Sequence, residues 1–352
     1  MDIGEFVVSG RNFKLKDYGP GSTGKYKDRA EAERKMAKDL RRLNKLQEML
    51  YAQNTQGVLL VFQAMDAAGK DSTVKHVMSG INPAGCQVTS FKAPSKEELD
   101  HDYLWRCIKA LPERGRIGIF IRSYYEEVLA VRVHPGILVS QALPIHLKDG
   151  GIWERRFKEI INFEEYLQAN GFLVLKFFLN VSRNEQKKRF IERIEDHSKN
   201  WKFSFDDINK RKLWKKYMKA YEDAIGATSS KECPWYIIPA DHKWFTRAIV
   251  ADIIVKRLKE LKLEFPHLTA KERSKLKEAR MLLEFKTALG GGRFCYFSNQ
   301  PFKQSVGNAA LDIGLFYPFS RNTFNYPNSI DRIIEISNYF PNEGKHVSYR
   351  ID

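Results

Sequence analysis

Residues 57–73 read GVLLVFQAMDAAGKDST, and this stretch decides the fold. Its first six residues are apolar and rich in β-branched side chains, which is typical of a parallel strand buried on both faces. Small residues follow, and then Lys70 and the polar run Asp71-Ser72-Thr73 indicate the start of a helix. A strand, a small-residue loop, a lysine and a helix form the order of a phosphate-binding loop. In such a loop the backbone N–H groups and the lysine face the anion.

The match to that loop is partial. In the usual spacing, a glycine is followed by four residues and then by Gly-Lys-Ser/Thr. Here Ala64 stands at the first glycine position, Asp71 stands at the hydroxyl position, and Asp66 adds an acid within the loop. An ordinary strand-to-helix turn with an exposed lysine is the competing interpretation of these residues.

The composition of the 352 residues is that of a globular protein, with 43% hydrophobic and 29% charged residues. A formal charge of +16 favours an anionic partner, and nucleic acid, a membrane surface or a polyanionic substrate would all serve. The four cysteines are far apart, so the chain has no CxxC metal or redox motif. The N-terminus lacks the features of a signal peptide and no apolar run reaches transmembrane length, so we expect a cytoplasmic protein.

Further apolar runs predict four more strands, which alternate with helical patterns in the manner of a parallel α/β sheet. The strands are expected at 87–91, 116–121, 171–179 and 235–238. Helices are expected at 27–53, 72–79 and 97–110, after an extended basic arm that covers roughly the first 26 residues. Ligands of such a sheet bind at the carboxyl ends of its strands.

Residues 182–224 form a basic helical stretch between the last two predicted strands. Its cations suit a lid that closes over phosphates, although a solvated helical face would show the same pattern. After a charged helical segment at 256–286, three glycines at 290–292 indicate a break. We therefore expect one domain at 1–286 and an atypical tail at 287–352, which is either a small add-on or a poorly ordered segment.

Several segments together resemble the second family of polyphosphate kinases, P-loop enzymes that move phosphoryl groups between inorganic polyphosphate and nucleotides. They occur in family order over roughly residues 10–265, and motifs in order are far more specific than the loop alone. The segments are AMDAAGKDST (64–73), INPAGCQVTSFKAPS (81–95), DYLWR (102–106), RSYYEEVLAVRVHP (122–135), LKFFLNVSRNEQKKRF (175–190), NWKFS (200–204), LWKKYMKAYEDAI (213–225) and PWYIIPADHKWF (234–245). The tail after residue 287 resembles nothing in that family.

This resemblance implies an α/β fold of the three-layer P-loop kinase-like class, with a central parallel five-stranded sheet and a helical lid at about 182–224. It implies Mg²⁺-dependent phosphoryl transfer from polyphosphate to AMP or ADP. A homo-oligomer without membrane association is expected. Lysine, arginine and Mg²⁺ supply the positive charge that phosphoryl transfer needs around the equatorial oxygens.

The resemblance also implies roles for single residues. Asp66, Lys70 and Arg122 are expected to be catalytic, and Asp66 is the expected Mg²⁺ ligand. The residues expected to hold polyphosphate are Lys70, Arg122, Arg183, Lys187 and Arg189. The residues expected to contact the nucleotide are Gly69, Lys92, Glu126 and Arg132, with Glu126 at a position where members that phosphorylate AMP as well as ADP tend to carry an acid.

One residue departs from the family pattern. The family's third strand ends in Asp or Asn just before Arg-Ser, and here that position is Ile121. An isoleucine side chain has no group that binds a metal or makes a hydrogen bond. Either the metal is held by other groups, or the activity of this chain is impaired.

Two other functions remain open at this point. The chain could be an ATP-dependent kinase of a small acceptor, which would not need a long basic groove. It could instead be a basic nucleic-acid-binding P-loop protein, although it carries no aromatic RNA-binding motif and no zinc finger. Turnover of ADP with polyphosphate discriminates between the three functions, whereas salt-dependent binding does not, because DNA and polyphosphate are both polyanions.

Overall fold

A computed structural model describes residues 2–8 and 12–288. The compact unit that contains the sheet comprises Met1–Ala279. The predicted tail at 287–352 lies almost wholly outside the described residues, so the predicted boundary near residue 287 stays a prediction. Among the helices that the structure describes, none combines the length and the apolar character needed to span a membrane.

The centre of the molecule is a five-stranded sheet in which every neighbouring pair of strands is parallel, as predicted. Its spatial order is β2-β3-β1-β4-β5. The strands are β1 (Gly57–Gln63), β2 (Cys86–Ser90), β3 (Ile117–Ile121), β4 (Phe172–Asn180) and β5 (Trp235–Pro239). Every residue of β1, β3 and β5 is buried, which explains why these runs are apolar on both sides.

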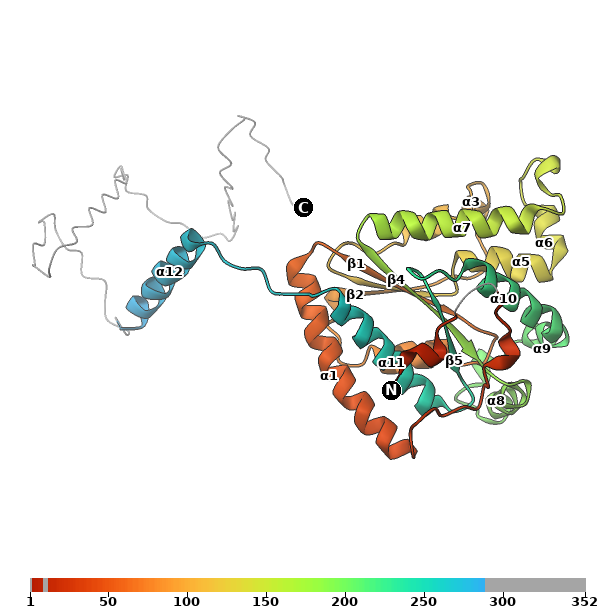
Figure 1. Ribbon diagram of the computed structural model, residues 1–352, viewed down its shortest axis with the longest axis horizontal. Helices are drawn as coiled ribbons and strands as arrows, with labels where there is room; N and C mark the ends of the chain where they lie inside the picture. Colours follow the sequence, from red (N-terminus) through yellow and green to blue (C-terminus); the bar gives the residue numbers. More distant parts are fainter. Residues whose placement is uncertain (1, 9–11, 289–352) are drawn as a thin grey trace, which may run out of the picture. The chain divides into compact units, whose positions relative to one another are not determined.

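Helices cover both faces of this sheet, so the unit has three layers. Figure 1 shows the strands between α1 with α11 on one side and α7 on the other. Helix α11 also contacts α2, and α7 contacts both β4 and α10. The helices of the described residues are α1 (Arg29–Gln53), α2 (Lys70–Val77), α3 (Lys96–Leu99), α4 (Trp105–Lys109), α5 (Ala130–Val133), α6 (Pro135–Ser140), α7 (Ile152–Ala169), α8 (Arg183–Glu195), α9 (Phe205–Lys212), α10 (Trp214–Thr228), α11 (Lys243–Glu260) and α12 (Ala270–Ala288).

The prediction of one continuous helix at 97–110 was wrong. The structure has two short helices there, α3 and α4, separated by residues 100–104. The Asp102 carboxylate accepts a hydrogen bond from the backbone N–H of Leu104 at 2.9 Å. An aspartate that bonds a backbone N–H two residues on favours a turn over a helix, and this explains the break.

The N-terminal arm is not a free extended segment. The backbone N–H of Val8 donates to the carbonyl of Trp235 at 2.9 Å, and Val7 forms an antiparallel bridge with Tyr236. Phe6 and Val8 are both buried. The arm therefore covers the edge strand β5, which would otherwise present unpaired backbone groups.

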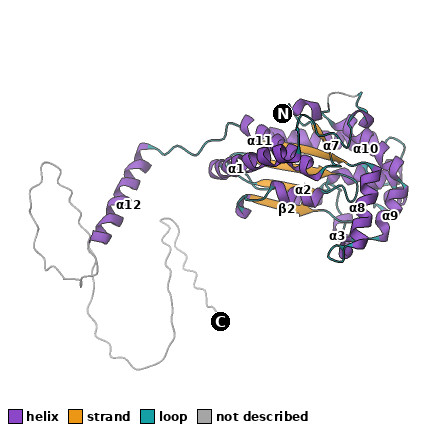
Figure 2. Cartoon of the chain, turned by 90° about the horizontal axis from the view of Figure 1, so that it is seen from below, coloured by secondary structure: helices purple, strands orange, loops and turns teal. Residues whose placement is uncertain are grey.

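The order of the strands places the ligand site. From β1 the chain crosses past β3 to β2, whereas β4 pairs with the opposite edge of β1. This reversal is a topological switch point, where open α/β sheets bind ligands beyond the carboxyl ends of the strands. Figure 2 shows α3, α8 and α9 gathered beyond one end of the strands. The loop between β1 and α2 begins at the same end, because it follows the last residue of β1.

Candidate active site

The loop between β1 and α2 has the backbone of an anion-binding turn. It spans residues 64–69 and ends at Gly69, whose φ of 107° lies in a region that side chains disfavour. Ala67 also has a positive φ, of 63°. Helix α2 begins at Lys70, two residues before its predicted start, so its free N–H groups lie next to the loop.

Lys70 lies inside this loop and not on the surface. Its ammonium group donates to the carbonyl of Ala64 at 2.7 Å and to that of Met65 at 3.4 Å. Burial lowers the pKa of Lys70, while the carboxylate of Asp66 opposes that shift. The interpretation as an ordinary turn with an exposed lysine is therefore wrong, since only 7% of Lys70 is exposed.

Helix α8 holds the loop in place. The guanidinium of buried Arg189 donates to the carbonyls of Ala67 at 3.1 Å and Ala68 at 2.8 Å. Its other arm donates to the carbonyls of Ala240 at 2.6 Å and Asp241 at 3.1 Å, in the segment after β5. Arg189 thus joins two loops, and these bonds leave its guanidinium little capacity for a ligand.

Asp66 is the point where cations from three elements meet. Its Oδ1 accepts from Arg122 Nη2 at 3.0 Å, and its Oδ2 lies 3.7 Å from Lys210 Nζ of α9. Burial raises the pKa of Asp66, but the charges of Lys70, Arg122 and Lys210 outweigh burial, so the net pKa lies below the usual carboxyl value. Asp66 is therefore ionised at neutral pH and available to bind a cation.

Arg122 has an unusual backbone at the end of β3. Its φ is 63°, which is uncommon for a residue with a side chain. Its N–H donates to the carbonyl of Phe62 in β1 at 3.0 Å, and this bond helps to hold the conformation. Left-handed residues of this kind often mark functional positions, and here the turn brings the guanidinium to Asp66.

Two cavities meet at these residues. The first, which we name the loop cavity, has a volume of about 610 Å³. Its lining contains five cationic side chains and three carboxylates, which are Lys70, Lys92, Arg122, Arg193, Lys202, Asp66, Asp71 and Asp207. Ile121 lines the same cavity and adds only an apolar surface. This excess of positive charge suits a chain of phosphates.

The second, which we name the middle cavity, has a volume of about 300 Å³. Its lining includes Asp66, Lys92 and Arg122, which also line the loop cavity. On the other side it is lined by Glu126, Glu127, Tyr217, Tyr221 and apolar residues of the segment 91–99 and of α5 and α6. Burial raises the pKa of Glu126, against the opposing charges of Arg122 and Lys70. A ligand here would reach the loop cavity with one end.

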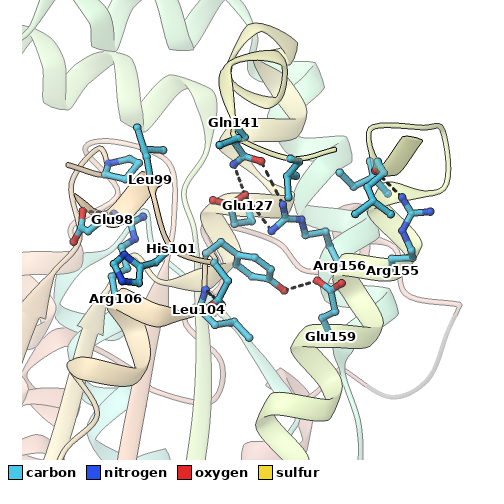
Figure 3. A pocket seen from close by; sticks show the side chains of 17 residues that line it. Glu98, Leu99, His101, Leu104, Arg106, Glu127, Gln141, Arg155, Arg156 and Glu159 are labelled. Atoms are coloured by element: carbon cyan, nitrogen blue, oxygen red, sulfur yellow. Dashed lines mark hydrogen bonds and ion pairs between the residues drawn. The ribbon is translucent and has the colours of Figure 1, made fainter. Parts of the chain in front are cut away.

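A third cavity, which we name the far cavity, is shown with its lining side chains in Figure 3. It shares lining residues with the middle cavity and none with the loop cavity. Its volume is about 380 Å³. The two share Pro94, Leu99, Arg106, Glu127 and Gln141 as a common wall. The three cavities therefore form a series that begins at the phosphate-binding loop and ends between α4 and α7.

The structure does not bring every predicted residue to these cavities. Asp66, Gly69, Lys70, Lys92, Arg122 and Glu126 line the loop cavity, the middle cavity or both. Arg183 lines a different cavity beside the N-terminal arm, and Lys187 is exposed on α8. Arg132 donates to Asp223 of α10 at 2.9 Å. The ligand contacts predicted for Arg183, Lys187 and Arg132 stay predictions.

The structure adds residues that were not among the predicted site residues. Arg193, Trp201 and Lys202 line the loop cavity, and Lys210 lines the middle cavity. The segment NWKFS at 200–204 was a signal for two of them, because it is one of the segments that carry the family resemblance. No comparable signal marked Lys210, which is one cation among many in a basic stretch.

Comparison with known proteins agrees with this geometry. A model of the family Polyphosphate kinase 2 (PPK2) matches residues 26–266. An ADP-polyphosphate phosphotransferase of Rhodopseudomonas palustris is 53% identical over 243 residues, which cover 69% of this chain and 84% of that protein. An AMP/ADP-polyphosphate phosphotransferase of Meiothermus ruber is 42% identical over 255 residues, which cover 72% of this chain and 91% of that protein.

A solved structure shows the same fold. The crystal structure of Polyphosphate Kinase 2 from Arthrobacter aurescens superimposes with a TM-score of 0.72 at 39% sequence identity. The match covers 79% of this chain and 97% of that one. The predicted fold class, an α/β P-loop kinase-like fold with a parallel five-stranded sheet, is confirmed.

Proposed function

The chain belongs to the polyphosphate kinase 2 family, and we propose that it transfers phosphoryl groups from inorganic polyphosphate to AMP and ADP with Mg²⁺. One observation about the candidate active site supports this proposal most directly. The loop cavity and the middle cavity share Asp66, Lys92 and Arg122, so two phosphorylated ligands would meet end to end at these residues.

The donor belongs in the loop cavity. Polyphosphate is a chain of negative charges, and the cations of the lining outnumber the carboxylates there. The N-terminus of α2 and the loop backbone add N–H donors at one end of that cavity. Trp201 and Lys202 of η6 (Asn200–Lys202) line it as well, together with Arg193 of α8.

The acceptor nucleotide belongs in the middle cavity, with its phosphates toward Lys92 and Arg122. In the reaction, a terminal phosphate oxygen of the nucleotide forms a bond to the last phosphorus of polyphosphate. The bond between that phosphorus and the bridging oxygen breaks, and the chain keeps the bridging oxygen and its electron pair. Lys70 and Arg122 neutralise the charge on the transferred group and hold both ends in line.

Asp66 suits one ligand position of a magnesium ion. Mg²⁺ binds through one or two carboxylates together with substrate phosphates and water. Within the described part of the chain, no group of three His, Cys, Asp or Glu side chains could hold a metal by itself. Asp66 would therefore share the ion with phosphate oxygens, and the bound ion would supply positive charge to the transferring phosphoryl group.

A transfer assay tests the proposal. The purified chain is incubated with polyphosphate, Mg²⁺ and either AMP or ADP, and the nucleotide products are separated by chromatography. We expect ADP and ATP to form and the polyphosphate to shorten. ATP-dependent phosphorylation of a small acceptor, without any polyphosphate turnover, would contradict the proposal. The predicted homo-oligomer and the cytoplasmic location stay predictions.

A further inference from the structure

A charged pair lies in the core of the sheet unit. Lys176 is the one charged residue of β4, and both Lys176 and its partner Glu164 of α7 are buried. The Lys176 ammonium lies 2.6 Å from Glu164 Oε2, and neither residue lines the loop, middle or far cavity. Replacement of such a pair by apolar residues of similar volume is often neutral or stabilising. Stability alone therefore does not explain why the core holds this pair.

The pair binds two tyrosines at the start of η4 (Tyr124–Val128). The hydroxyls of Tyr124 and Tyr125 each donate to Glu164 Oε1 at 2.9 Å, and the Lys176 ammonium donates to the Tyr125 hydroxyl at 3.2 Å. Both tyrosines are buried. Burial and the carboxylate of Glu164 raise the pKa of both tyrosines well above the ordinary value, so their hydroxyls stay protonated.

Two further side chains complete this network. Thr228 Oγ1 of α10 lies 3.0 Å from the Tyr125 hydroxyl, and Trp235 Nε1 of β5 donates to Thr228 Oγ1 at 3.0 Å. The Lys176 ammonium also donates to the Thr228 carbonyl at 2.8 Å. The network thus ties the first residues of η4 to β4, β5, α7 and α10. A buried network in which every member is paired holds its members rigidly.

The tyrosines follow Arg122 by two and three residues. The left-handed backbone of Arg122 is held on one side by the hydrogen bond from its N–H to the carbonyl of Phe62. On the other side, the Ser123 hydroxyl accepts from the N–H of Tyr125 at 3.2 Å, which joins the turn to η4. A strained backbone persists only where the surrounding structure fixes it. The buried network provides that support on the η4 side.

We propose that Glu164, Lys176, Tyr124 and Tyr125 are positioning residues for Arg122 in phosphoryl transfer. This inference rests on the proposed function, in which the Arg122 guanidinium neutralises the transferred group. The four side chains line none of the three cavities and act by fixing the turn from which Arg122 reaches Asp66. A displacement of about 1 Å at a catalytic group can lower the rate by about 10².

A double-mutant cycle separates this role from a general effect on stability. Tyr124→Phe combined with Tyr125→Phe removes both hydroxyls and keeps both rings. With ADP, polyphosphate and Mg²⁺, we expect this variant to lower kcat roughly tenfold. In an Arg122→Ala background, measured at high enzyme concentration, the same change should lower kcat by less than about twofold, because residues that act through one group are not additive.

Equal factors in the two backgrounds would overturn the proposal, since a weakened fold lowers kcat whether or not Arg122 is present. Tyr166→Phe is the matched control, because Tyr166 lies on α7 with 63% of its surface exposed and should leave kcat unchanged. Absence of transfer by the wild-type chain would instead overturn the proposed function.

Two further variants test the acceptor that the tyrosines share. Lys176→Met with Glu164→Gln removes both charges and keeps an oxygen for the hydroxyls, whereas Lys176→Met with Glu164→Leu removes that oxygen too. Both are assayed at a temperature at which circular dichroism shows them folded. We expect kcat within about threefold of wild type for the Gln variant, and roughly tenfold or more below it for the Leu variant. The same kcat in both variants would contradict the proposal. If the Leu variant does not fold, the cycle with the tyrosines decides.

Discussion

A substitution of Arg189 tests whether this residue of helix α8 binds polyphosphate or holds two loops in place. The sequence predicts that Arg189 holds polyphosphate. In the structure its guanidinium donates hydrogen bonds to four backbone carbonyls on two loops. Arg189→Lys keeps the positive charge but removes the fork of N–H donors. An ammonium group is a point donor and cannot reach carbonyls on both sides of the side chain.

The cost of this change follows from the bonds lost. Lysine would leave at least two of the buried carbonyls without a partner, and each unsatisfied group costs about 1–3 kcal/mol. Taking roughly 3 kcal/mol in total, and about 2–4 °C per kcal/mol for a unit of this size, we expect the melting temperature to fall by about 6–12 °C.

Thermal unfolding followed by circular dichroism measures this fall, and transfer kinetics follow both substrates. If Arg189 holds the loop, turnover falls and the KM values for polyphosphate and ADP rise together. Lys188→Ala is the control, because Lys188 is exposed on the same helix and is not among the residues expected to hold polyphosphate. An unchanged melting temperature, with an increase confined to the KM for polyphosphate, would refute the structural role and support the ligand contact.

Three further predictions concern the centre of the site. Lys70→Ala should lower kcat by about 10²–10³, as for the removal of one transition-state donor, with the fold retained by circular dichroism; near-normal turnover would exclude Lys70 from the mechanism. Ile121→Asn puts a polar group on the wall of the loop cavity. It should raise turnover about tenfold, or 1.4 kcal/mol in barrier, and lower the melting temperature because Ile121 is buried; equal or lower turnover would show that this position does not limit the chemistry. Lys210→Ala removes a cation that competes for Asp66, so Mn²⁺ binding followed by electron paramagnetic resonance should tighten roughly two- to fivefold. Lys212→Ala is its control on the same helix, and weaker Mn²⁺ binding by Lys210→Ala would contradict the competition.

The sheet could be predicted from sequence because its strands are buried on both faces. Runs such as 57–62 and 171–179 are almost wholly apolar, and the observed strands begin and end within one residue of the predicted limits. The break at 100–104 was missed because one aspartate decides it. Its side chain bonds a nearby backbone N–H, and the helical pattern of the surrounding residues does not record that competition.

The roles of single cations were harder to predict. In the sequence, Arg183, Lys187 and Arg189 are similar members of one basic helix. In the structure, Gln186, Arg189 and Phe190 form the buried face of α8, at spacings of three and four residues. Phe190 could have indicated which face of α8 is buried, because an amphipathic helix packs its apolar side against the protein interior. The Lys210 side chain reaches Asp66 because of the orientation of α9 relative to α8. No local sequence pattern specifies that orientation.

These contacts divide the predicted lid at 182–224 into two parts. Gln186 donates to the backbone carbonyl of Asp66 at 2.9 Å, and Arg189 binds the same loop, so α8 is fixed to the phosphate-binding loop. Helix α9 buries none of its residues, and it is held by polar contacts such as Arg211 with Gln186 at 2.8 Å and Arg193 with Asp207 at 3.6 Å.

If the predicted lid closes over the donor, we therefore expect η6 and α9 to move and α8 to stay in place. Segments with few buried apolar contacts open at low free energy, whereas anchored ones open only with the core. Hydrogen exchange should be fast for α9, slow for α8, and slower for α9 when polyphosphate is added. Equal exchange along both helices would mean that the whole stretch moves as one lid.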